Sequence, residues 1–425
     1  GDQSGRGMRK RPRQNPGPAC QQCRLRKLRC DRQTPCNGCL DAGVECNVDP
    51  TPPQRGPKKG HLKALRSRIG RPSRPPGTQR ESTCFLHGGS PLEHQADTWD
   101  RKRDQLYFDR IHAFVPAIHH RRYLQRSRVA LPTPSHRCLQ YAMWTMASAM
   151  SSQFHHLRDS LYRGTLDLLH ALDDARPTTA GTAATTDNDD EASLLAQAQA
   201  WILVAVYEFV QLPSSFRRAW ASVGRAIRLV QLLRLSEMDA GDDHDAAVLD
   251  FTTPYNGDTD VDVCIEREER RRTFWVAFCL DRFASALSGL PLTLGELIST
   301  RLPCPEPAFQ SATSVVMPLL SEIMETTDMD AEPRALSAPS SPWVECIVFC
   351  TLWGRALSHQ QRSKLEHFHG PVAVAFRERQ VRLDELLTSR MRLFQQRYAP
   401  GAVKSDPMLL FTNLVAQATV LSLCK

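Results

Sequence analysis

The sequence predicts a small metal-binding module with two short helices near the N-terminus, followed by a large all-α domain. Two observations predict this fold class. Six cysteines are concentrated within residues 20–46, at a spacing that suits metal ligation. From about residue 95 onward, apolar residues recur at the three- and four-residue intervals of amphipathic helices, and patterns typical of strands are scarce.

The six cysteines form two halves with the same internal spacing. Each half reads C-x2-C-x6-C, and the six residues are Cys20, Cys23, Cys30, Cys36, Cys39 and Cys46. Two tetrahedral zinc ions require eight ligand positions, which six thiolates supply only if two of them bridge both metals. The count therefore predicts a cluster of two Zn²⁺ ions without any histidine ligand.

Other interpretations of these cysteines fit the sequence less well. A disulfide framework needs a secretory context, yet the chain opens with basic residues and no apolar signal segment. A site with four cysteine ligands would leave Cys30 and Cys46 unused. The remaining eight cysteines stand singly or in apolar stretches, which is typical of reduced thiols in a protein core.

The segments between these cysteines differ in charge. Asp41 and Glu45 lie between the fifth and sixth cysteines. Four cations lie between the second and third, on a segment expected to be a short helix: Arg24, Arg26, Lys27 and Arg29. A phosphate backbone attracts the first segment and repels the second, so one side of the module is expected to face DNA.

The run from Cys20 to Cys46, with this basic stretch and with Pro35 before the fourth cysteine, resembles the Zn2Cys6 DNA-binding domain of fungal zinc-cluster transcription factors. The resemblance implies that Cys20 and Cys36 are the two bridging ligands. It also implies that Lys27 approaches the guanines of a CGG triplet in the major groove, where O6 and N7 accept hydrogen bonds.

The other side chains of the basic segment are expected to have supporting roles. Arg24, Arg26 and Arg29 are predicted to contact phosphates and so to set the register of the module on DNA. Leu25 and Leu28 are expected to pack against the metal cluster or the second helix.

Charge divides the chain in the same way. Residues 1–80 contain 19 Lys or Arg and 5 Asp or Glu, a net charge of +14, whereas the whole chain carries +8. Residues 1–19 are expected to form a basic, disordered arm, suited to nuclear import or phosphate contact. Residues 20–46 form the predicted zinc module. Residues 47–94 are predicted to be a proline-rich linker with a short helix at 61–69, which offers about one heptad and leaves homodimerisation open.

Residues 95–425 are predicted to form one all-helical domain with flexible loops at 177–192, 239–262 and 303–342. Phe274, Trp275 and Phe278 are expected in its core, and Arg270–Arg272 on the surface or paired with acidic neighbours. Three stretches resemble the fungal-specific regulatory domain found downstream of many zinc clusters: Tyr107 to His119, Ala219 to Leu229, and Glu266 through Asp281-Arg282 to Leu292.

These features predict a nuclear, sequence-specific regulator of RNA polymerase II transcription. It is expected to read CGG-type triplets in double-stranded promoter DNA, to act with the transcription machinery and to control a metabolic pathway, with a secondary-metabolite gene cluster as one candidate. No enzyme is predicted, because the chain lacks a phosphate-binding loop, a nucleophile elbow and a His-Glu-x-x-His motif. No membrane contact is predicted, because the apolar runs fall short of the roughly 20 residues that a span needs.

Two alternatives remain open. The helical domain could bind a metabolite and so gate DNA binding, or the cysteines could serve a zinc- or redox-sensing protein without specific DNA binding. The target genes, the sign of regulation, the effector, the half-site spacing, the oligomeric state and the completeness of the chain at either end also remain open.

Overall fold

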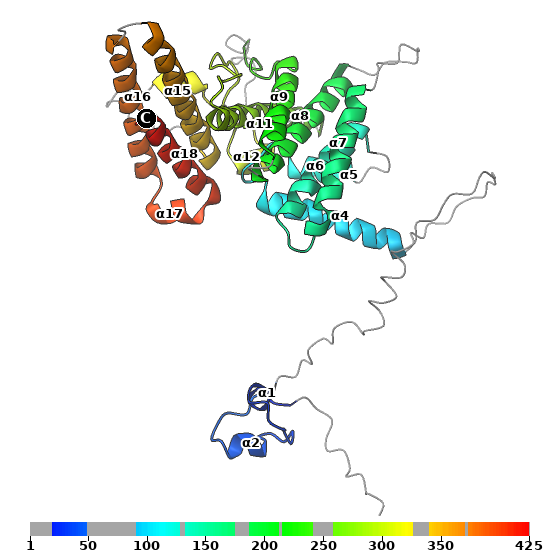
Figure 1. The fold of residues 1–425 in the computed structure, drawn as a ribbon. Coiled ribbons are helices and arrows are strands. Elements are labelled where there is room, and N and C mark those ends of the chain that lie inside the picture. The colour runs from blue at the N-terminus through cyan, green and yellow to red at the C-terminus, as the bar shows by residue number, and fades with distance from the viewer. Residues whose placement is uncertain are drawn as a thin grey trace, which may run out of the picture. The chain divides into compact units, whose positions relative to one another are not determined.

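The computed structural model describes residues 19–48, 91–127, 132–174, 187–211, 215–240, 258–325, 340–369 and 373–424. The chain divides into two compact units, Gly1–His87 and Gly88–Lys425 (Figure 1). The described part of the chain is helical and contains no strand, so the predicted fold class is confirmed. Nearly all of the basic arm and the helix predicted at 61–69 lie outside the described residues.

The first unit contains two short helices, α1 (Gln21–Leu25) and α2 (Asn37–Leu40). Four cysteines supply its buried core, and the apolar side chains that pack around them are few. Such a small core stabilises a fold weakly, so the free energy of folding has to come mainly from bound metal.

The second unit is a set of packed helices with one principal hydrophobic core. Its longer helices are α4 (Pro91–Arg110), α5 (His120–Ser127), α6 (Pro134–Ala149), α7 (Arg158–Asp174), α8 (Asp187–Val210), α9 (Phe216–Leu232), α11 (Asp258–Ser288), α15 (Pro342–His369), α16 (Ala373–Arg397) and α18 (Pro407–Leu423). The shorter elements are η1 (His155–Leu157), α12 (Glu306–Gln310), α13 (Leu320–Glu325) and α17 (Pro400–Ser405).

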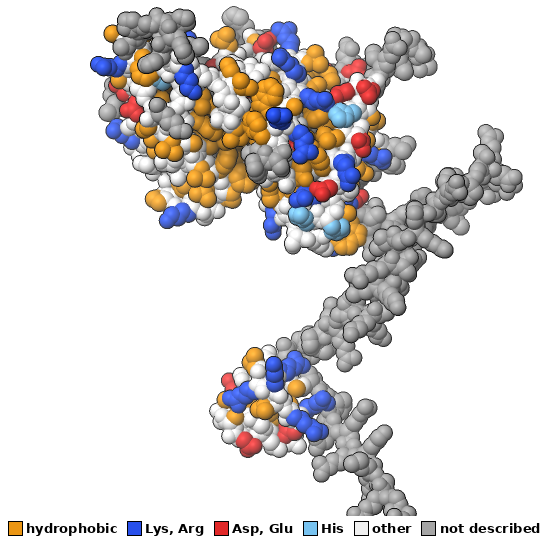
Figure 2. Space-filling model, in the orientation of Figure 1, with side chains coloured by type: hydrophobic (Ala, Val, Ile, Leu, Met, Phe, Trp, Pro, Cys, Tyr) orange, Lys and Arg blue, Asp and Glu red, His pale blue; other side chains and the backbone are white. Residues whose placement is uncertain are grey.

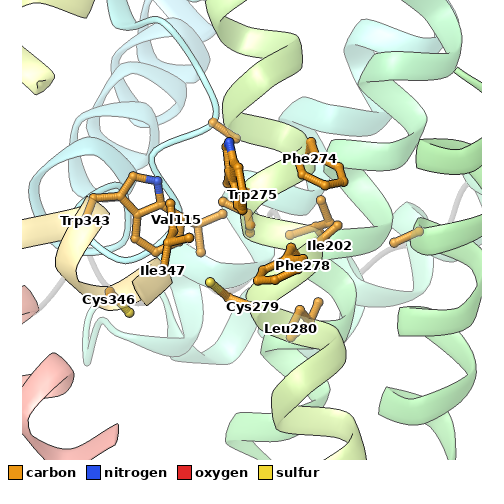
Figure 3. Close-up of a cluster of buried hydrophobic side chains, with 14 of the residues drawn as sticks. Val115, Ile202, Phe274, Trp275, Phe278, Cys279, Leu280, Trp343, Cys346 and Ile347 are labelled. Atoms are coloured by element: carbon orange, nitrogen blue, oxygen red, sulfur yellow. The ribbon is translucent and has the colours of Figure 1, made fainter. Parts of the chain in front are cut away.

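Helix α11 joins two groups of helices. On one side, α6 packs on α4, α7 and α8, and α8 packs on α9. On the other side, α15 packs on α16 and α18, and α11 contacts α8, α9 and α15 (Figure 1). The aromatic residues predicted for the core, Phe274, Trp275 and Phe278, are buried on α11. Figure 3 shows them with Ile202 of α8 and Ile347 of α15.

Helix α8 is long and apolar enough in its stretch Asp190–Val210 to cross a membrane, judged by length and composition alone. However, 67% of its most apolar window is buried inside the unit, where α8 packs against α6 and α9. This burial is typical of a central core helix.

The basic run on α11 pairs with acidic neighbours, as predicted. Arg271 bonds to Asp239 at 3.0 Å and to Glu268 at 2.8 Å. Arg272, which is almost fully buried, bonds to Glu268 at 3.0 Å. Arg270 also bonds to an acidic neighbour, Glu191, at 2.7 Å. The pairs with Asp239 and Glu191 hold α11 against neighbouring segments, whereas the pairs with Glu268 lie within α11, so the run has a structural role.

The prediction of a loop at 303–342 is wrong for residues 303–325. Residues 303–325 contain α12 and α13, and Phe309, Met317 and Leu320 from this segment are buried in the core. The Ser- and Pro-rich composition suggested a loop, but contacts with distant residues, such as the bond from Arg272 to Glu306 at 2.5 Å, fix the segment in place. Residues 326–339 lie outside the described part.

Three other boundaries also shift, because helices begin inside the predicted loops and linker. Helix α8 begins at Asp187, α11 at Asp258 and α4 at Pro91. The first turns of α8 and α11 are rich in Asp. Such a composition suggests a loop, but Asp is also favoured at a helix N-terminus because of the helix dipole. Residues 177–186 and 241–257 lie outside the described part.

Candidate metal centre and DNA-binding surface

The two halves of the cysteine module repeat one local structure. A cysteine in extended conformation precedes each helix, Cys20 before α1 and Cys36 before α2. The Sγ of Cys20 accepts a hydrogen bond from the backbone N–H of Cys23 at 3.4 Å, as an N-cap side chain does. The second cysteine of each half, Cys23 or Cys39, then lies buried on the helix and directs its thiol inward.

Both helices end in the same turn. After α1, the N–H of Leu28 donates to the carbonyl of Cys23 at 2.9 Å, and the N–H of Lys27 donates to the carbonyl of Arg24 at 3.2 Å. Equivalent bonds follow α2, and they place Gly43 where the first half has Lys27. This pattern is a Schellman motif, whose central residue adopts a left-handed conformation.

The prediction that Lys27 lies on the helix is therefore wrong, because α1 ends at Leu25. The φ of Lys27 is 53°, and the φ of Gly43 is 63°, so both residues occupy the left-handed region. Glycine adopts this region without strain, whereas a lysine adopts it at a cost of roughly 1–2 kcal/mol. The turn holds the Lys27 side chain exposed at the C-terminal end of α1.

The thiols of the two halves converge. The Sγ of Cys20 lies 3.7 Å from that of Cys36 and 3.6 Å from that of Cys39, and the Sγ atoms of Cys23 and Cys36 are 3.6 Å apart. All four side chains are buried. Two thiolates on one tetrahedral zinc with Zn–S bonds of about 2.3 Å are about 3.8 Å apart, so these distances fit shared metal ligation.

The third cysteine of each half lies at the edge of this cluster. Cys30 groups with Cys36 and Asp31, with the ligand atoms within 4.8 Å of one another. The Sγ of Cys46 accepts the backbone N–H of Cys36 at 3.4 Å. Cys36 thus neighbours thiols of both halves. The six cysteines predicted as zinc ligands therefore lie close together in the module.

Asp31 also belongs to this site, although it was not among the predicted residues. Its carboxylate accepts the N–H of Gln33 at 3.4 Å and that of Asn37, the first residue of α2, at 3.1 Å. An Asp directly after a metal-binding cysteine and six residues before a helix start is the signal that could have identified it. These bonds give Asp31 a role in fixing the loop between the two halves.

The donor set fits two zinc ions. All six cysteines are free thiols. The backbone N–H of Cys23 lowers the pKa of the Cys20 thiol to about 6, while the hydrogen bond with Cys20 raises the pKa of Cys23 to about 12. Burial raises the pKa of Cys39. Crowded thiols of this kind can all be thiolates only when cations neutralise them, which is the condition that zinc binding supplies.

The charged side chains of the module are segregated. The four cations of the first half are exposed, namely Arg24, Arg26, Lys27 and Arg29. Asp41 and Glu45 of the second half are exposed too. Figure 2 shows Lys and Arg gathered on one part of the small module and acidic side chains mainly elsewhere on it. One surface of the module is therefore suited to a polyanion.

The prediction for the two leucines of this segment is wrong. Leu25 is 78% exposed and Leu28 is 56% exposed. Helix α1 ends at Leu25, so the helical spacing that would have placed both leucines on one inward face does not continue. Both leucines lie beside the cations, on the surface of the module.

Comparison with protein families gives two matches. A family model described as the fungal Zn(2)-Cys(6) binuclear cluster domain matches residues 18–55. A second, described as the fungal specific transcription factor domain, matches residues 105–397. The two matches cover both units of the chain.

Curated relatives resemble the chain over nearly its whole length. The citrinin biosynthesis transcriptional activator of Monascus ruber is 35% identical over 481 aligned positions, which cover 98% of this chain and 87% of the relative. The azaphilone cluster-specific transcription factor of Aspergillus niger is 38% identical, with 97% and 87% covered. The pigment biosynthesis transcriptional activator of Monascus ruber is 38% identical, with 97% and 76% covered. No solved structure matches the chain.

Proposed function

The chain belongs to the fungal transcription factors that combine a Zn2Cys6 binuclear cluster, which binds two zinc ions, with a fungal-specific transcription factor domain, and we propose that it activates a secondary-metabolite gene cluster by binding CGG-containing promoter DNA. Members of this family are transcription factors and not enzymes. The observation that carries the proposal is the exposed Lys27 in a left-handed turn beside the thiol cluster.

The six cysteines of the module are the zinc ligands in this proposal. Cys20 and Cys36 are assigned as the bridging thiolates, each bound to both metals. The assignment is supported by the position of Cys36, which neighbours Cys20, Cys23 and Cys30, and by that of Cys20, which neighbours Cys36 and Cys39. Bound zinc supplies the positive charge that keeps the thiols ionised and the two helices in place.

The DNA contacts follow from the same geometry. Lys27 is proposed to donate hydrogen bonds to guanine O6 and N7 in the major groove. Arg24, Arg26 and Arg29 are proposed to bind phosphates on either side and to set the register. Because a hydrogen-bonded turn fixes the backbone of Lys27, binding has to order only its side chain, whereas a lysine on a flexible loop must order its backbone as well.

The biological role is inferred from the relatives. Three of them are named as regulators of citrinin, azaphilone and pigment biosynthesis, and each aligns with 97–98% of this chain. We therefore propose that the protein regulates a biosynthetic gene cluster. It would act in the nucleus, together with the transcription machinery. The +14 net charge of residues 1–80 supports DNA association and suits nuclear import.

Whether one or two copies bind DNA determines the form of the promoter site. We propose a homodimer on two CGG half-sites. Sedimentation of the full chain with duplexes that carry one or two CGG triplets, at several spacings, tests this. A complex with two protein copies at one preferred spacing is expected, and one copy at every spacing would contradict the dimer.

The regulatory role is tested in a fungal strain that lacks the gene. Reintroducing the full chain should restore transcripts of one biosynthetic gene cluster and occupancy at its CGG-containing promoters, whereas the Cys36→Ser chain should restore neither. A matched control is Cys424→Ser, because Cys424 is exposed and directly follows α18. If the Cys36→Ser chain restored transcription fully, the zinc module would not be the DNA-binding part.

A further inference from the structure

A cavity of about 670 Å³ lies in the second unit, between helices α5, α6, α8 and α11. This volume is in the range of small-molecule sites, which is about 300–1,000 Å³. The cavity is separate from the zinc module and includes none of the residues assigned above to metal or DNA. In Figure 1 these helices lie in the half of the unit that contains α4 to α11.

One wall of the cavity is apolar. It consists of side chains from α6, α7 and α8 and from the turn before α5, namely Ile118, Leu139, Leu172, Leu195 and Ala196. Leu139 and Leu195 are buried, so this wall is anchored in the core of the unit. A wall of this kind favours a flat or branched hydrocarbon body.

Two arginines from one face of α5, Arg122 and Arg126, also line the cavity, and within the described residues only Arg122 makes ion pairs. Arg122 bonds to Glu269 at 2.7 Å and to Glu266 at 2.5 Å, and Glu269 also accepts the N–H of His119 at 2.8 Å. The carboxylates of Glu266 and Glu269 are therefore already bonded to groups of the protein itself.

Arg126 lies one helical turn further along α5 and lines the cavity. Within the described residues it makes no hydrogen bond or ion pair, although Glu266 and Glu269 attract it from a longer distance. Arg126 is exposed to solvent. Partial desolvation by its neighbours lowers the pKa of Arg126, and the positive charge of Arg122 lowers it further. A guanidinium in this environment binds an anion favourably.

The N-terminus of α6 adds positive potential to the cavity lining. Thr133 caps this 16-residue helix by accepting the N–H of His136 at 3.3 Å, and Thr133, Pro134 and Ser135 all line the cavity. The helix dipole places a partial positive charge at this end. The lining also holds three carboxylates, those of Asp190, Glu266 and Glu269. The favourable position for an anion is therefore beside Arg126 and the start of α6, where Ser127 Oγ of α5 lies 3.3 Å from His136 Nε2.

We propose that this cavity binds a small organic acid, with its carboxylate on Arg126 and a body of one or two rings over the apolar wall. Such a ligand would give the helical unit a binding role separate from DNA recognition by the zinc module. The contact is a charge-assisted hydrogen bond, which is stronger than the bond that a neutral amide of the same shape would form.

The test is calorimetric titration of the full chain with 2-naphthoate and with 2-naphthamide, which has the same rings but no charge. The acid is expected to bind at least tenfold more tightly than the amide. Arg126→Ala should remove that difference by weakening the acid alone, and Arg126→Lys should keep part of it. Arg121→Ala is the matched control, since Arg121 is exposed on α5 and does not line the cavity.

A second variant fills the cavity without changing its charge. Ala192→Phe should weaken both probes, because Ala192 lines the cavity, and thermal unfolding shows whether the variant is folded. Equal affinity for acid and amide, no effect of Arg126→Ala, or no saturable binding of either probe would overturn the proposal. The readout involves no DNA, so its result is independent of the proposed DNA-binding function.

Discussion

Lys27 and Gly43 occupy equivalent positions in the two halves of the zinc module, each four residues after the second cysteine of its half. Their φ values are 53° and 63°, and the same pair of backbone hydrogen bonds surrounds each of them. Glycine suits this position, and nothing lies within 4 Å of where a Cβ of Gly43 would be. A lysine stands at this position in one half only, and the proposed contact of its side chain with guanine would be the function that offsets the strain.

Replacing Lys27 by glycine should separate the backbone from the side chain. Lys27→Gly relieves the left-handed strain, so the zinc cluster should resist chelation at least as well as before. Discrimination between CGG and a scrambled duplex should fall by about 1–3 kcal/mol, because the base contact is lost. Lys27→Ala should lose the same discrimination without the relief of strain. Competition anisotropy measures this, and unchanged discrimination in both variants would remove Lys27 from the base contacts.

Arg26 should behave differently from Lys27. If Arg26 contacts a phosphate, Arg26→Ala should weaken binding to the CGG and scrambled duplexes by similar factors. The same substitution should reduce the slope of log affinity against log salt concentration by about 1. Salt titrations on both duplexes measure the slope. A loss confined to the CGG duplex would instead make Arg26 a base-reading residue.

The bridging assignment predicts unequal effects of cysteine substitutions. Cys36→Ser should cost the module most of both zinc ions, because Cys36 contacts both metals in the assignment, whereas Cys46→Ser should weaken mainly one site. Zinc per full-length chain, measured by elemental analysis after dialysis, distinguishes the two variants, with Cys424→Ser as the control. Equal metal loss in both would contradict bridging by Cys36.

Arg272 should be a large contributor to the stability of the helical unit. Its guanidinium bonds to Glu268 at 3.0 Å, to Glu306 at 2.5 Å and to the carbonyl of Cys304 at 2.7 Å, and it lies over the Phe309 ring at 4.0 Å. Arg272→Ala should lower the free energy of unfolding by about 3–5 kcal/mol, because buried Glu268 keeps only one of its two arginine partners and the buried carbonyl of Cys304 loses its donor.

Urea unfolding of the full chain measures this stability. The control is Arg217→Ala, at an exposed position of α9, which should change stability by less than about 0.5 kcal/mol. If the two substitutions had equal effects, the buried ion pairs would not be what fixes residues 303–310 on α11.

The helical unit should lose stability in mild acid through His136. Burial, aided by the charge of Arg126, lowers the pKa of His136 from 6.5 to about 4. Between these values the unfolded chain binds a proton that the folded chain does not bind, so stability falls as the pH decreases below 6.5. From pH 7 to pH 5 this loss should be about 2 kcal/mol.

His136→Gln should remove that part of the pH dependence, whereas His155→Gln, at an exposed position, should leave it unchanged. Urea unfolding at both pH values measures the difference. An equal slope in the wild type and in His136→Gln would show that His136 is not the group responsible.

The sequence was sufficient for the features that depend on local spacing. The repeated cysteine offsets identified the thiols that converge, and the apolar periodicity of α11 identified Phe274, Trp275 and Phe278 as core. The exposure of Leu25 and the left-handed Lys27 could not be predicted, since both depend on where α1 ends, and that end is set by hydrogen bonds of the turn. Comparison of Lys27 with Gly43 at the same offset was the available signal.

Long-range packing explains the remaining differences. Residues 303–325 have the composition of a loop, but Phe309 and Met317 fill the core, and Arg272 binds Glu306 from 34 positions away. The cavity between α5, α6, α8 and α11 depends on the same kind of contact. Arg126 resembles any other surface arginine until the pairing of Arg122 with Glu266 and Glu269 is known.

We propose that zinc creates a specific DNA-binding surface around Lys27. Fluorescence anisotropy of the full chain, at physiological salt, on a CGG-containing and on a scrambled duplex, with zinc and after chelation, is the decisive measurement. The predicted result is a preference for the CGG duplex that disappears when zinc is removed. Equal, salt-sensitive binding to both duplexes that is unaffected by chelation would contradict the claim.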